Sequence, residues 1–168
     1  MPDKSCNAYR GFTLVELVIT IIIISVLSAV AISNITARNQ HSVTVQADQF
    51  RRALSHLQLL AISQSLRLRL STSSTNYTAV SCTTSACTST AALTDPATGQ
   101  SFSVDLTDGA AIAPANNILD FDSLGRPQSS GSLKITTSTY TLSGNGNCVQ
   151  ISVLPITGFA SAGAPYAC

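Results

Sequence analysis

The hydrophobic and polar positions of this chain change their spacing twice. From Phe12 to Ala37 most residues are apolar, and the one charged side chain in that stretch is Glu16. A run this long and this apolar predicts a helix that spans a membrane. We expect that helix over residues 12–35, after a short polar segment of residues 1–11.

Beyond residue 35 the apolar side chains keep a helical spacing but occupy one face only. They recur at intervals of four and three residues, which is typical of an amphipathic helix packed on a sheet. The positions are Val43, Ala47, Phe50, Leu54, Leu57 and Ala61. The chain has no proline between Pro2 and Pro96, so no proline is expected to break this helix, which we assign to residues 36–65.

The spacing shortens to two at Leu66-Arg67-Leu68-Arg69-Leu70, and strict alternation is typical of a β-strand. We expect its leucines to face the core and its arginines to face water. Gly144-Asn145-Gly146-Asn147 predicts a tight hairpin turn. Further short strands are expected at 77–82, 102–106, 118–121, 133–136, 140–142 and 148–154.

This order of elements predicts an α+β fold. The long N-terminal α-helix would be membrane-spanning in its first half and amphipathic in its second. It would pack on an antiparallel β-sheet head, which we assign to residues 66–168.

Charge and cysteine content narrow the class of protein. Charged residues make up 10% of the 168, with a formal net charge of +1, so bulk charge points to no nucleic-acid or acidic partner. Past the helix the chain has an even set of cysteines, which favours disulfides in an oxidising compartment. They are Cys82, Cys87, Cys148 and Cys168. Sequence neighbours suggest the pairs Cys82–Cys87 and Cys148–Cys168, one of three pairings that four cysteines allow.

Candidate chemistry is sparse. The sequence has no nucleophile motif, phosphate loop or metal-ligand cluster, so we expect no enzyme, no cofactor and no metal. Asp120 and Asp122 would share one face of a strand as a carboxylate pair. The simpler interpretation is a strand end where Asp122 bonds to the local backbone.

Four basic residues of the head raise the alternative of a DNA-binding face. They are Arg67, Arg69, Arg126 and Lys134. A solvated strand face is the preferred interpretation, because the tail after Gly158 is without basic residues and stacking platforms are missing.

Glu16 is the only glutamate of the chain. A carboxylate in an apolar helix costs about 2.5–3.5 kcal/mol at the bilayer centre and less near the interface. Glu16 would lie one turn from the helix start, where the helix dipole stabilises a negative charge and makes the cost of the carboxylate tolerable. The sequence Gly11-Phe12-Thr13-Leu14-Val15-Glu16-Leu17, after a short polar leader, also resembles the class III signal of type IV pilins and type II secretion pseudopilins.

The resemblance implies that residues 1–11 are a leader. A prepilin peptidase would cleave between Gly11 and Phe12, and Phe12 would then be N-methylated. Glu16 would pair with the amino terminus of a neighbouring subunit, inside a filament core built from residues 12–35. The implied partners are other pilin or pseudopilin subunits, the peptidase and an inner-membrane assembly platform.

A second resemblance concerns the head. Residues 119–127, followed by 149–153 and Thr157-Gly158, are similar to the secretion-system H pseudopilin and its minor-pilin relatives. A C-terminal cysteine pair is more typical of pilins, including minor pilins of mannose-sensitive haemagglutinin type. The implied function is that of a minor pilin in a type IV pilus. The alternatives are an H-type pseudopilin of type II secretion and a DNA-binding minor pilin. The implied location is the bacterial inner membrane, single-pass with the head in the periplasm, and then the pilus or pseudopilus.

Overall fold

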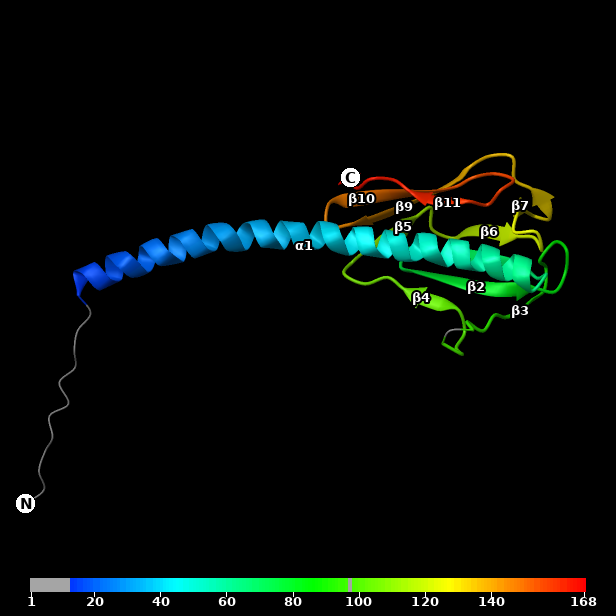
Figure 1. Ribbon diagram of the computed structural model, residues 1–168, viewed down its shortest axis with the longest axis horizontal. Helices are drawn as coiled ribbons and strands as arrows, with labels where there is room; N and C mark the ends of the chain where they lie inside the picture. Colours follow the sequence, from blue (N-terminus) through cyan, green and yellow to red (C-terminus); the bar gives the residue numbers. More distant parts are fainter. Residues whose placement is uncertain (1–12, 97) are drawn as a thin grey trace, which may run out of the picture. The chain divides into compact units, whose positions relative to one another are not determined.

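The computed structural model describes residues 13–96 and 98–168, with side chains described outside residues 29–41. It divides into two compact units, Met1–Arg38 and Asn39–Cys168. One helix, α1 (Leu14–Ser63), passes through both units (Figure 1). Among the described residues, no helix combines the length and the apolarity that crossing a membrane requires. The membrane span over residues 12–35 stays a prediction.

The second half of α1 buries the stripe that its spacing predicts. Each of its six apolar residues is at most 1% exposed: Val43, Ala47, Phe50, Leu54, Leu57 and Ala61. Asp48 lies away from the stripe and pairs with Arg51 and Arg52 at 2.7 and 2.6 Å. The amphipathic prediction for this half of the helix is therefore confirmed.

The larger sheet of the head is antiparallel and has seven strands in the order β3-β2-β1-β6-β7-β8, with β4 paired to β2. Its strands are β1 (Arg67–Thr72), β2 (Asn76–Cys82), β3 (Thr90–Ala92), β4 (Ser103–Asp105), β6 (Asn117–Phe121), β7 (Pro127–Ser129) and β8 (Ser132–Leu133). In β1 the predicted alternation holds on one face, because Leu68 and Leu70 are buried.

The smaller sheet has five antiparallel strands in the order β11-β10-β9-β5, with β12 paired to β10. They are β5 (Ala111–Ala113), β9 (Ser138–Gly144), β10 (Asn147–Val153), β11 (Ala160–Ala162) and β12 (Tyr166–Ala167). The turn between β9 and β10 has positive φ at Asn145 (52°) and Gly146 (78°), as a two-residue hairpin turn of type I′ requires. The hairpin prediction is confirmed.

Phe50 joins the helix to both sheets. Its ring meets Tyr77 of β2 edge-on at a centroid distance of 4.9 Å, and Tyr140 of β9 at 5.4 Å. One continuous core therefore contains residues of the helix and of both sheets. The α+β prediction is confirmed, but the head has two sheets where the sequence predicts one.

Two glutamines of α1, one towards each end of this core, form hydrogen bonds with loops of the head. The amide of Gln46 accepts a hydrogen bond from Thr107 N–H (3.0 Å) and donates one to Thr107 O (3.1 Å), in the connection from β4 to β5. The amide of Gln58 donates to Gly125 O (2.9 Å), in the turn after β6, and to Thr157 O, in the turn after β10. Gln46 thus binds the connection between the two sheets, and Gln58 binds one turn of each sheet.

We expect Phe50→Ala to lower the free energy of unfolding by about 3–5 kcal/mol, because it leaves a cavity where helix and both sheets meet. Urea unfolding of the full chain in detergent measures this. Leu59→Ala is the matched control, since Leu59 lies on the same helix and is exposed. A loss for Phe50→Ala no larger than for Leu59→Ala contradicts the central place of Phe50.

Candidate functional site

The start of α1 is a capped helix terminus. The hydroxyl oxygen of Thr13 accepts a hydrogen bond from the Glu16 N–H at 3.2 Å, which satisfies one of the free donors of the first turn. Thr13 and Glu16 have the spacing of a capping box, a sequence signal that marks this helix start. Glu16 is the acidic residue of this first turn, where a negative charge gains from the helix dipole.

The turns that follow Glu16 present an aliphatic surface. Large apolar side chains from Leu14 to Leu27 are exposed in this unit. The hydroxyls of Thr20, Ser25 and Ser28 donate to carbonyls three or four residues earlier, at 2.7–2.8 Å. Those polar groups are thus satisfied within the helix.

The Glu16 carboxylate differs from these hydroxyls. Among the residues that the structure describes, it has no ion-pair partner. Gly11 and Phe12 lie outside the described residues, so cleavage between them and methylation of Phe12 stay predictions. The pairing of Glu16 with another subunit also stays a prediction.

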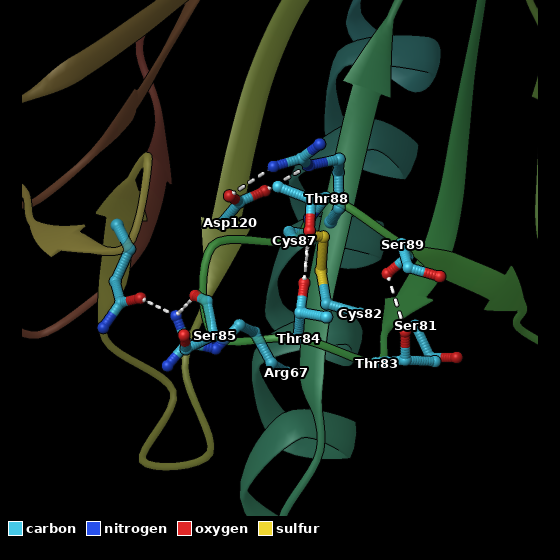
Figure 2. Close-up of a disulfide and its surroundings, with 12 residues drawn as sticks. Arg67, Ser81, Cys82, Thr83, Thr84, Ser85, Cys87, Thr88, Ser89 and Asp120 are labelled. Carbon is cyan, nitrogen blue, oxygen red and sulfur yellow. Dashed lines mark hydrogen bonds and ion pairs between the residues drawn. A yellow bond between two sulfur atoms is a disulfide. The ribbon is translucent and has the colours of Figure 1, made fainter.

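On the head, the Cys82–Cys87 disulfide closes a loop over the outer face of the larger sheet (Figure 2). The two sulfurs and a carboxylate oxygen of Asp120 lie within 4.8 Å of one another. Because the sulfurs are bonded to each other, neither is a thiolate that a metal ion would need. The cluster is a disulfide beside an ion pair.

The two arginines of β1 do not face open water, so that prediction is wrong. Arg69 is bound through two nitrogens to Asp120, at 2.7 and 2.8 Å, with side chains 20% and 2% exposed. Arg67 donates to Ser85 O in the disulfide loop and to Gln128 Oε1 of β7. Alternation identifies the outer face of a strand, but it does not show that a distant loop covers that face.

Asp122 confirms the local-turn interpretation. Its Oδ1 accepts hydrogen bonds from Leu124 N–H (2.9 Å) and Arg126 N–H (2.8 Å), and its Oδ2 accepts from the Arg126 guanidinium (2.8 Å). Burial, the largest single influence, raises the pKa of the Asp122 carboxyl, but these hydrogen bonds outweigh it. The pKa therefore lies below its ordinary value of 3.8.

These contacts decide between the alternatives for the charged residues. Asp120 and Asp122 each bind a different arginine, so they do not act as a carboxylate pair. For the same reason Arg69 and Arg126 do not supply free positive charge to a basic face.

The second disulfide joins Cys148, in β10, to Cys168. β12 lies against the same strand, with Tyr166 opposite Cys148, and the Cys168 N–H donates to Gly146 O at 3.2 Å. Both disulfides follow the pairing of sequence neighbours. The chain segment after β11 is thereby fixed along β10.

Comparison with known proteins gives two findings and one absence. Residues 6–32 match the prokaryotic N-terminal methylation motif, a range that contains Gly11, Phe12 and Glu16. The fold resembles the minor pseudopilin EpsH from the Type 2 Secretion System of Vibrio cholerae. That match covers 73% of this chain and 97% of the other, with a TM-score of 0.55 and 16% identity. No curated protein matches the chain significantly.

We expect Asp122→Asn to lower the free energy of unfolding at pH 7 by about 1–3 kcal/mol, because charge-assisted hydrogen bonds from Arg126 are lost. Since the folded pKa is depressed, the stabilisation is fully present above the unfolded value of 3.8 and is lost as the pH falls through the folded value. Wild type should therefore lose stability more steeply with acid than Asp122→Asn.

Urea unfolding of the full chain between pH 7 and pH 2 measures both slopes. Asp105→Asn is the control, since Asp105 is an exposed strand residue, and we expect a change within about 0.5 kcal/mol. Parallel curves for wild type and Asp122→Asn contradict the role given to Asp122.

Proposed function

We propose that this chain, a type IV pilin-like subunit with the fold of an H pseudopilin, is a minor subunit that enters a fibre through its N-terminal helix. The methylation motif supports a pilin-like N-terminus, and the fold likeness to EpsH supports a head of the H pseudopilin type. The subunit is structural, and catalysis plays no part in the proposal.

The observation that carries the proposal is Glu16. Its carboxylate stands in the first turn of an aliphatic helix surface without a cation among the described residues. In lipid or in a bundle of such helices, an unpaired carboxylate is unfavourable. The methylated amine of Phe12 on the adjacent subunit is the complementary charge, and it becomes available once the leader is cleaved after Gly11.

Pairing at this position would do more than neutralise a charge. The helix surface after Glu16 is aliphatic and offers many nearly equivalent ways for two helices to slide along each other. A buried ion pair allows one register, because any other leaves both charges unpaired. The apolar half of the helix is thus a membrane anchor before assembly and part of the fibre core afterwards.

Two machines fit this subunit. A type IV pilus, including one of mannose-sensitive haemagglutinin type, is supported by the Cys148–Cys168 pair near the C-terminal end. A secretion pseudopilus is supported by the fold likeness to the minor pseudopilin EpsH. In either case the peptidase and an inner-membrane platform are the proposed partners, and the disulfides favour a head on the periplasmic side. Binding of DNA by the head has less support, because Arg69 and Arg126 are neutralised.

The mature protein should begin at an N-methylated Phe12, which mass spectrometry of the purified chain measures. Gly11→Ser should leave the precursor uncleaved, because the peptidase requires the glycine in this motif. Pro2→Ser, in the same leader, is the control and should be processed normally. A wild-type chain that begins at Met1, or well past Ile35, would falsify the proposal.

We expect Glu16→Ala to be processed normally but to enter fibres at least about tenfold less, because the neighbour's amine is left unpaired in an apolar bundle. Glu16→Asp is the matched variant that keeps the charge, and it should retain part of the incorporation. The amount in sheared surface fibres tests the pilus, and the release of secreted enzymes tests the pseudopilus. Normal incorporation of Glu16→Ala rules out the pairing.

A further inference from the structure

The turn between β10 and β11 holds Ile156 in a conformation that isoleucine avoids. Its φ is +66°, and the Thr157 N–H donates to Pro155 O at 2.7 Å, so Ile156 is the central residue of a γ-turn. That conformation is strained, and a positive φ makes a β-branched residue an outlier. Its side chain is nevertheless 59% exposed, so core packing does not explain the residue. Glycine, which has no Cβ, would suit this backbone better and would present less apolar surface to water.

The surrounding contacts leave this turn little freedom. Gln58 of α1 donates to the carbonyl of Thr157 and to that of Gly125 in the neighbouring turn. Gly158 admits the close approach of the two turns, since a Cβ there would lie 2.5 Å from Gly125 O. Leu154 N–H also donates to Phe159 O at 2.9 Å. Strain that the surroundings enforce in this way is a recognised mark of functional positions.

Ile156 belongs to a group of exposed apolar residues around the Gln58 contacts, which we call the clasp patch. Its members are Ile62, Leu124, Ile156 and Phe159, between 47% and 63% exposed. Ile62 packs on the turn next to Leu124, because a Cβ on Gly125 would lie only 2.7 Å from its side chain. In Figure 1 the end of α1 and β7 lie at the same end of the sheets.

The clasp patch contains no ionised group. The nearest basic residue in sequence, Arg126, is engaged by Asp122. A partner surface that fits the patch is therefore uncharged and apolar. A membrane surface fits less well, because peripheral proteins use lysines and arginines to meet anionic headgroups.

The size of the patch indicates how the partner is held. Four side chains cover far less than the roughly 800 Å² per partner that a stable independent complex buries. Such a contact gains strength when its partner is already kept alongside by another interaction, which raises the effective concentration. Adjacent subunits of a fibre, joined through their N-terminal helices, meet that condition.

We propose that the clasp patch docks on an uncharged apolar surface of the head of the adjacent subunit in the same fibre, with Ile156 among its contact residues. This inference rests on the proposed function, because the adjacent subunit is the partner that the helix holds in place. The strained backbone at Ile156 then has a role, since it directs an apolar side chain outward from a rigid turn.

The test uses the full chain in its own cells with the substitution Ile156→Asn. Ile156 is 59% exposed and asparagine is not β-branched, so processing at Gly11 should be normal and the thermal midpoint in detergent unchanged or higher. The incorporated fraction should fall by about tenfold, because an isoleucine contact is lost from the interface. A variant that is at least as stable yet poorly incorporated separates this role from a structural one.

Tyr166→Asn is the matched control. Tyr166 is 46% exposed, and it lies in β12 opposite Cys148, next to the β9–β10 hairpin. That hairpin is near Val43, some four helical turns before Gln58, and so at the other end of the head. This variant should enter fibres normally. Equal losses for the two variants overturn the inference, as does normal incorporation of Ile156→Asn.

A photoreactive phenylalanine analogue at position 159 identifies the partner. Adducts with the head of an adjacent subunit support the inference, and adducts with lipid alone overturn it. If wild type enters fibres but Ile156→Asn does so equally well, this inference fails and the proposed function stands. If wild type is neither cleaved after Gly11 nor found in fibres, the proposed function fails and this inference fails with it.

Discussion

The head depends on one stripe of a helix that packs against two sheets at once. Phe50 meets a tyrosine from each sheet, Gln46 binds the connection between the sheets, and Gln58 binds one turn of each sheet. Neither sheet alone would bury this face of α1. The helix is therefore the element that makes a single core out of two sheets, and its sequence has to satisfy both.

The spacing of apolar residues and the turn residues predicted the local and periodic parts of the fold. The stripe on α1 and the turn at Asn145 and Gly146 are local and periodic, and the structure has both. The short strands β5, β11 and β12 carry no alternation that separates them from loops. They exist because longer neighbours offer hydrogen-bonding edges, which is a tertiary effect. For the same reason, the local sequence pattern does not predict that the head divides into two sheets.

Polar contacts across the fold were the hardest to foresee. Gln46 and Gln58 look like solvent-facing helix residues, although both fall in the same row of four-residue steps as Phe50 and Leu54. Arg69 looks exposed until Asp120 and the disulfide loop are placed beside it. By contrast, the segment from Gly11 to Glu16 is contiguous, so its motif can be recognised in the sequence even though the start of that segment lies outside the described structure.

The two glutamines have a consequence for where such a head can work. An amide carries no charge and does not titrate, so salt does not screen its hydrogen bonds as it screens exposed ion pairs. The helix should stay packed on its sheets at high as well as low salt concentration. It should also do so over a wide range of pH above the pKa of the Asp122 carboxyl. A head held by such uncharged contacts suits an environment in which salt concentration and pH vary.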